Sequence, residues 1–106
     1  MNSSIEVALR EAKKALGELY GERLARVVLY GSQARGDATP ESDADVLVVL
    51  RGPVDVVAEI KRLVPLETTL LDRYEEVVSL MPFAEARYRN AEHPLMMNVH
   101  AEGVEL

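Results

Sequence analysis

The sequence predicts an α/β fold in which helices and strands alternate along the chain. Residues 3–20 repeat apolar residues at helical spacing, and residues 53–72 do the same. Residues 24–30 and 43–50 are rich in branched apolar residues, which is typical of strands. A chain of 106 residues has the length of one domain, so we expect a single α/β sandwich over residues 1–106.

The first helix and the first strand have clear boundaries in the sequence. Ser3 followed by Glu6 fits a capping box at the start of the helix. Apolar residues at helical spacing give the helix one face that can be buried. Gly21 is expected to end this helix, and the strand at residues 24–30 (L-A-R-V-V-L-Y) follows.

A polar connection joins the first two strands. Ser32 is a good N-cap, so a short helical turn is expected to begin there, and Pro40 keeps the later residues in a loop. The second strand, residues 43–50, has apolar residues on both faces and should lie in the middle of the sheet. A connection of about a dozen residues is short for a parallel crossover, but it leaves parallel and antiparallel pairing open.

The second half of the chain begins with another helix. Pro53 suits its first position, and Pro65 should kink the helix or split it in two. Its expected apolar stripe comprises Val56, Val57, Ile60, Leu63, Val64 and residues 66–71. A third strand is predicted at residues 75–81, and Pro82 is expected to open a short helix. A last helix at residues 95–102 should stop at Gly103.

Composition limits the classes of function. With 48% hydrophobic and 28% charged residues, the chain is typical of soluble globular proteins. It has no membrane-length apolar run, and its first residues lack the features of a signal peptide. It also has no cysteine, which excludes disulfides and zinc–thiolate sites and fits a cytoplasmic protein. The net charge of −6 argues against sequence-independent binding to duplex nucleic acid.

Two carboxylates stand at the start of the second strand. Asp43 and Asp45 are two residues apart, so their side chains point to one face and their Cα atoms lie roughly 6.5 Å apart. Their charges repel by about 2–3 kcal/mol at an effective dielectric constant near 20. Burial beside Val46 and Leu47 adds a desolvation cost. A divalent cation relieves both terms, so the sequence predicts a magnesium site here.

A Gly-Ser pair precedes these carboxylates and is suited to a phosphate. Gly31 allows a phosphate to approach the backbone closely, and the helix start at Ser32 offers N–H groups and a hydroxyl. Arg35 has two equally good partners, the triphosphate or Asp37. A P-loop is rejected because Asp37 stands where that motif requires lysine. Metal on the aspartates and triphosphate on the helix start together indicate nucleotidyl transfer.

The spacing Gly-Ser-x10-Asp-x-Asp resembles the signature of the DNA polymerase beta-like nucleotidyltransferase superfamily. The likeness includes Arg35-Gly36, Ser42 before the first acid, and the apolar strand after the second. In particular, the chain resembles the small minimal nucleotidyltransferase (MNT) branch, and its C-terminal residues 89–106 also look like the end of such proteins. The resemblance therefore covers nearly the whole chain.

This resemblance implies a mixed sheet flanked by helices and magnesium-ATP as the donor. It also implies pairing with a HEPN-domain protein. In such pairs, which form toxin–antitoxin modules, the MNT protein silences the HEPN ribonuclease by adenylylating a tyrosine. One departure concerns the third carboxylate that the superfamily carries on a later strand, where this chain has Ser79. Glu75 or Glu76 could substitute, and strand alternation would place Glu75 on the face of Ser79.

Two hypotheses follow. In the first, the protein transfers AMP from ATP-Mg to a protein hydroxyl: Asp43 and Asp45 hold metal, and Gly31, Ser32 and Arg35 hold the nucleotide. The acceptor would come from a partner or from a second subunit of a homo-oligomer. In the second, the fold neutralises a HEPN partner by contact, with little or no catalysis. Ser79 favours this alternative, because an acid there usually activates the attacking hydroxyl. Modification of a small molecule is disfavoured for want of a second domain.

Overall fold

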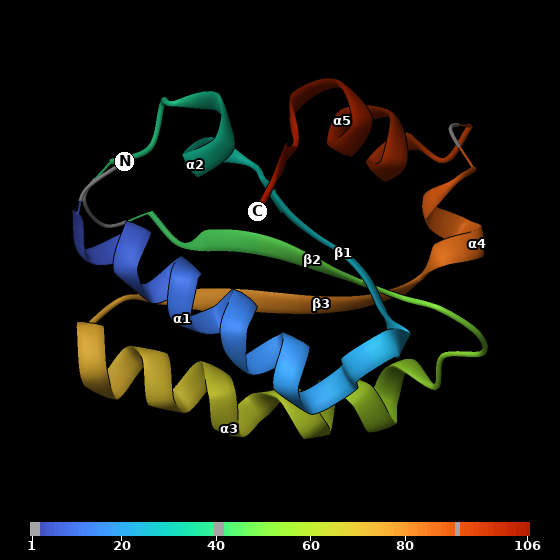
Figure 1. The fold of residues 1–106 in the computed structure, drawn as a ribbon. Helices are drawn as coiled ribbons and strands as arrows, with labels where there is room; N and C mark the ends of the chain where they lie inside the picture. Colours follow the sequence, from blue (N-terminus) through green and yellow to red (C-terminus); the bar gives the residue numbers. More distant parts are fainter. Residues whose placement is uncertain (1–2, 40–41, 91) are drawn as a thin grey trace.

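The computed structural model describes residues 3–39, 42–90 and 92–106. A four-stranded sheet in the order β3-β2-β1-β4 lies between two layers of helices (Figure 1). The strands are β1 (Leu24–Tyr30), β2 (Ala44–Leu50), β3 (Val78–Ala84) and β4 (Val104–Glu105). The helices are α1 (Ser3–Tyr20), η1 (Gly21–Arg23), α2 (Ser32–Arg35), α3 (Val56–Tyr74), α4 (Glu85–Tyr88) and α5 (Pro94–Glu102).

The sheet is mixed and β2 lies in its middle, as predicted. β1 pairs with β2 in antiparallel orientation, whereas β2 and β3 are parallel. The short connection after β1 therefore returns the chain antiparallel, and the long helix α3 makes the parallel crossover to β3. This confirms the α/β class and the mixed sheet.

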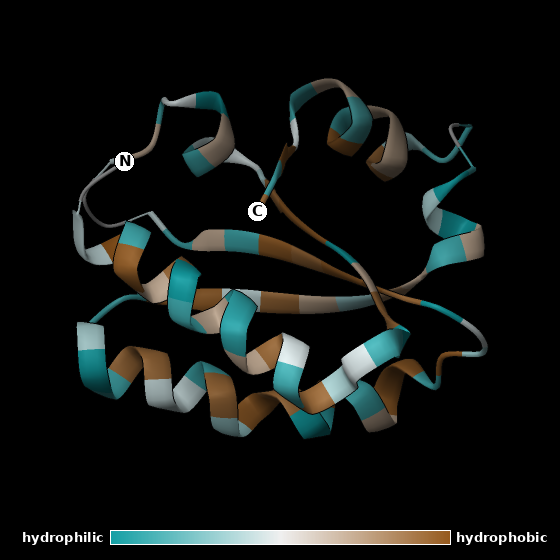
Figure 2. Ribbon diagram, viewed as in Figure 1, coloured by the Kyte–Doolittle hydropathy of each residue, from teal (hydrophilic) through white to brown (hydrophobic). Residues whose placement is uncertain are grey.

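Each face of the sheet carries its own apolar cluster. On one face, Val46 and Val48 of β2 pack with residues of α1 and α3, including Leu16 and Leu63. On the other face, Leu47 and Val49 pack with residues of α5. Figure 2 shows the hydrophobic colour along the strands. Both faces of β2 are buried, which explains its unbroken apolar sequence.

The first helix and the first strand lie where the sequence predicts them. In α1, Ile5, Leu9, Ala12 and Leu16 are buried at helical spacing. Gly21 ends the helix with a positive φ of 54°, a conformation that glycine adopts without a steric penalty.

Helix α3 begins and continues differently from the prediction. Its N-cap is Asp55, whose side chain accepts a hydrogen bond of 3.2 Å from the backbone N of Ala58, so Pro53 lies outside the helix. Pro65 lies inside α3 without splitting it. Its position is exposed, so the proline ring faces solvent and does not disturb the buried side of the helix.

The predicted apolar stripe of α3 is only partly buried. Leu63 and Leu70 are buried, but Val57, Ile60 and Val64 are exposed. A charged residue takes part of the buried face instead: Glu59 is 4% exposed and accepts a hydrogen bond of 2.8 Å from the Tyr20 hydroxyl. An apolar-rich helix has more than one apolar side, and its sequence alone does not select which side packs.

The third strand begins three residues later than predicted and contains Pro82. β3 lies at the edge of the sheet, where a residue without an N–H is tolerated, so the strand continues through the proline. The outward backbone N of Leu80 donates to the carboxylate of Glu67 on α3 at 2.8 Å. The short helix expected at Pro82 begins instead at Glu85.

The last helix stops at Gly103 as expected, and a short strand follows it. Pro94 occupies the first turn of α5, and β4 pairs antiparallel with β1 after Gly103. Among the described residues, no helix combines the length and apolar character needed to cross a membrane.

Candidate active site

Asp43 and Asp45 lie at the start of β2. Asp45 is the second residue of the strand and pairs with Tyr30 of β1 on one side and Ser79 of β3 on the other. Asp43 precedes the strand and is exposed. Strand alternation turns Asp45 to the face of Leu47, which is the face covered by α5 and not by α1 and α3.

The surroundings of Asp45 disfavour its charged form. Partial burial of Asp45, together with the negative charge of Asp43, raises the pKa of the Asp45 carboxyl above its ordinary value. Burial and the charge of Asp45 likewise raise the pKa of the Tyr30 hydroxyl. The start of β2 therefore carries two negative charges in a partly desolvated environment, as the sequence predicts.

This donor set fits a magnesium ion. Two carboxylates supply the hard oxygens that Mg²⁺ prefers, and phosphate oxygens and water usually complete its shell. The described part of the chain has no group of three or more His, Cys, Asp or Glu side chains arranged to hold a metal. These residues would supply two carboxylate ligands to the metal. A bound nucleotide would have to supply the remaining ligands.

The turn after β1 lies directly against Asp45. Gly31 has a φ of 76°, and a Cβ placed on it would lie 2.6 Å from Oδ2 of Asp45. Only glycine leaves room for the carboxylate at this position. Ser32 is the first residue of α2 and Gly31 is its N-cap. The N-cap therefore lies one residue earlier than predicted. The structure thus brings the Gly-Ser pair and the second aspartate together.

Arg35 has two carboxylate partners. Its Nε donates to Asp37 at 3.2 Å and its Nη1 donates to Glu102 of α5 at 3.2 Å. These bonds raise the pKa of Arg35. Of the two alternatives for Arg35, the structure shows the bond to Asp37. Glu102 was not found from the sequence, because no local pattern indicates that residues 67 positions apart meet.

The chain matches the nucleotidyltransferase domain family over residues 9–93. It belongs to this family. Two proteins of Methanocaldococcus jannaschii with the name "Putative protein adenylyltransferase" are similar to it. MJ0604 is 39% identical over 80 residues, which are 76% of this chain and 74% of that protein. MJ0141 is 31% identical over 71 residues, 67% of this chain and 71% of that protein.

Solved structures show the same fold. A structure described as a toxin–antitoxin with AMP-PNP superposes with a TM-score of 0.59 at 23% identity, covering 86% of this chain and 66% of that one. A structure described as "a putative nucleotidyltransferase from Sulfolobus solfataricus" gives a TM-score of 0.54 at 22% identity, covering 99% of this chain and 86% of that one. The nucleotidyltransferase fold expected from the resemblance is confirmed.

Ser79 stands where the superfamily resemblance implies a third carboxylate, and it pairs directly with Asp45. The prediction that Glu75 shares a strand face with Ser79 is wrong, because Glu75 does not lie on β3. β3 begins at Val78, and Glu75 is the C-cap of α3 with a φ of 56°. Alternation along a strand therefore does not apply to Glu75, whose role as a third acid stays a prediction.

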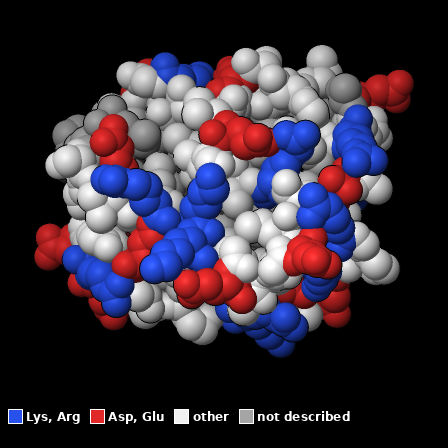
Figure 3. Space-filling model, viewed as in Figure 1, with Lys and Arg blue, Asp and Glu red and all other residues white. Residues whose placement is uncertain are grey.

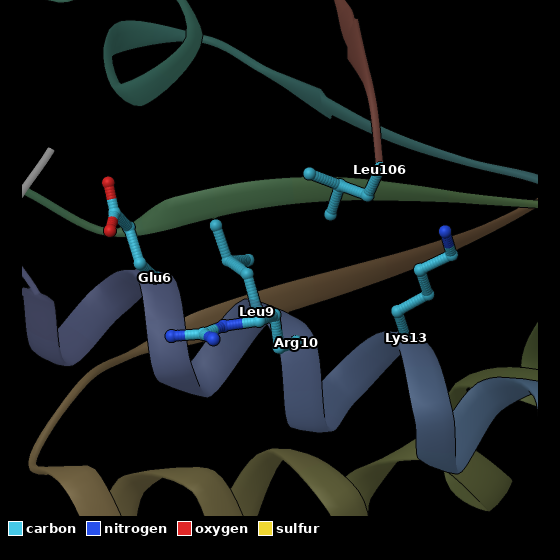
Figure 4. Close-up of a pocket in the computed structure, with 5 residues that line it drawn as sticks. All are labelled: Glu6, Leu9, Arg10, Lys13 and Leu106. Carbon is cyan, nitrogen blue, oxygen red and sulfur yellow. The ribbon is translucent and has the colours of Figure 1, made fainter.

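A separate groove of about 540 Å³ lies between α1 and the end of the chain (Figure 4). Its lining residues are Glu6, Leu9, Arg10, Lys13 and Leu106, and none of them is a predicted site residue. Figure 3 shows basic and acidic side chains interspersed over this side of the molecule. The charge pattern of this face does not form the continuous basic surface that nucleic acid binding requires.

Proposed function

We propose that this nucleotidyltransferase transfers AMP from ATP-Mg to a hydroxyl on a partner protein. The observation that carries the proposal is the contact between the Gly-Ser turn and the metal-binding pair: Gly31 lies against Asp45, and Asp45 stands beside Asp43. A triphosphate on the turn would reach a metal on the two carboxylates without any rearrangement of the sheet.

The residues have distinct roles in this proposal. Asp43 and Asp45 hold Mg²⁺, which neutralises charge on the phosphates when bound. The turn at Gly31 and Ser32 holds the triphosphate, and Arg35 adds a positive charge at the end of α2. The acceptor oxygen attacks the α-phosphorus and loses its proton to solvent water, while the bond to pyrophosphate breaks and pyrophosphate leaves.

The partner is proposed to be a HEPN-domain toxin that accepts AMP on a tyrosine. Support comes from the relatives named as protein adenylyltransferases and from solved relatives described as toxin–antitoxin structures. The resemblance to the MNT branch points the same way. The proposed setting is the cytoplasm.

A label-transfer assay tests the proposal. The protein is incubated with Mg²⁺, ATP labelled at the α-phosphate, and the protein encoded in the neighbouring reading frame. We expect label on that protein, lost when Asp43→Ala and Asp45→Ala are combined. Transfer that survives the double substitution would show that the proposed site is wrong.

One observation favours a second function. Ser79 stands beside Asp45 where an acid would activate the acceptor, and a serine hydroxyl is a poor general base at neutral pH. The protein would then neutralise its partner by binding alone. Tight binding of the partner, with no label transfer and no nucleotide binding by calorimetry, would establish this alternative.

A further inference from the structure

The polar side chain of Gln33 is buried next to the proposed nucleotide site. Gln33 is the second residue of α2 and is 8% exposed. Its Nε2 donates a hydrogen bond of 3.1 Å to the backbone carbonyl of Ser42. A buried amide that binds a backbone carbonyl from another segment holds the two segments at a fixed distance.

This bond matters because the two aspartates are held in different ways. Asp45 lies inside the sheet, with strand partners on both sides. Asp43 precedes the sheet, so its position depends on the peptides around it. In the residue after Asp43, the backbone N of Ala44 donates to the carbonyl of Val77 at 2.9 Å. In the residue before Asp43, the Ser42 carbonyl accepts the bond from Gln33.

Two hydrogen bonds from backbone N–H groups join Thr39 and Ser42. The backbone N of Thr39 donates to the Ser42 hydroxyl oxygen at 2.9 Å, and the backbone N of Ser42 donates to the Thr39 carbonyl at 3.0 Å. These bonds fix Ser42 relative to Thr39. The Gln33 amide connects Ser42 to α2, whose first residues form the proposed phosphate site.

We propose that Gln33 is a positioning residue that couples the phosphate-binding turn to the metal ligand Asp43. When a nucleotide orders the start of α2, the hydrogen bond from Gln33 to Ser42 orders Asp43 as well. Metal binding at Asp43 orders the start of α2 through the same bond. The two ligands therefore bind with positive coupling, which is reciprocal by thermodynamic necessity. This inference rests on the proposed function, because it takes the same nucleotide and metal site as given.

The test measures the affinity for AMP-PNP by calorimetry, with and without Mg²⁺, in the wild type and in Gln33→Met. Methionine keeps the length and volume of the side chain but cannot donate to Ser42. We expect the magnesium-induced gain in affinity to fall about three- to tenfold, the scale of one lost hydrogen bond. The affinity without metal should stay within about twofold of wild type, since Gln33 is not a proposed phosphate ligand.

A control separates coupling from general loosening of the fold. Thr69→Val removes another hydrogen bond from a side chain to a backbone carbonyl, that of Thr69 to Pro65 on α3. It should leave the magnesium-induced gain at the wild-type value. A gain in Gln33→Met equal to that of Thr69→Val would overturn the inference, while the proposed function would stand.

A measurement on the wild type covers the case in which Gln33→Met does not fold. AMP-PNP without metal should slow hydrogen exchange at the Asp43 amide, because the hydrogen bond from Gln33 to Ser42 restricts this segment when α2 is ordered. Unchanged exchange with bound nucleotide would contradict the coupling. If the wild type binds no AMP-PNP with or without Mg²⁺, the proposed function fails and this inference fails with it.

Discussion

The carboxylate of Asp45 occupies the space that a side chain at position 31 would need, since a Cβ on Gly31 would lie 2.6 Å from Asp45 Oδ2. The turn that follows β1 and the second aspartate of β2 are therefore packed against one another. A change in either one is transmitted to the other, and this relationship makes the site testable by substitution.

Gly31→Ala should displace the Asp45 carboxylate. We expect the affinity for AMP-PNP in the presence of Mn²⁺ to fall about tenfold or more, because a shifted ligand loses the geometry that a metal requires. Alanine at a positive φ should also lower the free energy of unfolding by about 1 kcal/mol or more. Calorimetry and thermal unfolding measure the two effects.

Gly52→Ala is the matched control. Gly52 has a φ of 78°, close to the 76° of Gly31, but a Cβ there would meet no atom within 4 Å. The backbone penalty should be similar and the nucleotide affinity unchanged. Equal nucleotide affinities in the two variants would refute the role assigned to the contact with Asp45.

Asp45→Asn should stabilise the metal-free protein at neutral pH. The folded pKa of Asp45 lies above its unfolded value, so the fold binds this proton more tightly than the unfolded chain does. The charged carboxylate therefore costs stability above the raised pKa, and this cost disappears as pH falls toward the unfolded value near 3.9. We expect the free energy of unfolding to rise by about 0.5 kcal/mol. The effect is small because Asp45 is partly exposed to solvent.

Chemical unfolding in EDTA at pH 7 and at pH 4 measures this difference. The comparison is between variant and wild type at each pH, because other carboxylates titrate in both proteins. The advantage of Asp45→Asn should shrink at the lower pH. A variant less stable than wild type at pH 7 would show that the buried charge is already compensated.

Ser79→Asp should supply the third carboxylate that the superfamily resemblance implies, since Ser79 pairs directly with Asp45. We expect tighter binding of Mg²⁺ and faster label transfer, together with a lower melting temperature without metal because three carboxylates repel. Met81→Asp is the control, as Met81 is exposed on the same strand and pairs with Leu47. Equal metal affinity in the two variants would exclude position 79 from the metal site.

Glu102→Gln should release Arg35 from one of its two carboxylate partners. If Arg35 serves the phosphates, freeing it should raise the affinity for AMP-PNP by about two- to fivefold, the scale of an exposed ion pair. Glu105→Gln is the matched control, because it breaks the exposed pair between Glu105 and Arg26. Identical affinities in these two variants would show that Arg35 does not contact the nucleotide.

The parts of the fold with local sequence signals were predicted well. α1, β1 and the central strand β2 each follow from periodicity or from a run of branched residues. The contact between Gly31 and Asp45 is consistent with the spacing of the motif, although it depends on the antiparallel register of β1 and β2, which the sequence left open.

Features that depend on neighbours in space were missed. Pro82 was expected to end a strand, but β3 lies at a sheet edge where its missing N–H has no cost. Glu59 was not expected inside α3's buried face, because its partner Tyr20 lies on another helix. The bonds of Gln33 and Glu102 likewise join segments that the sequence does not bring together.

We propose that metal and nucleotide bind together at Gly31, Ser32, Asp43 and Asp45. Mn²⁺ added with AMP-PNP broadens nearby amide signals in an NMR spectrum, and so locates the metal directly. We predict broadening centred on residues 31–35 and 43–45, with Thr69 on α3 unaffected. Broadening centred instead on the groove at Arg10 and Lys13, or no broadening at all, would contradict the account.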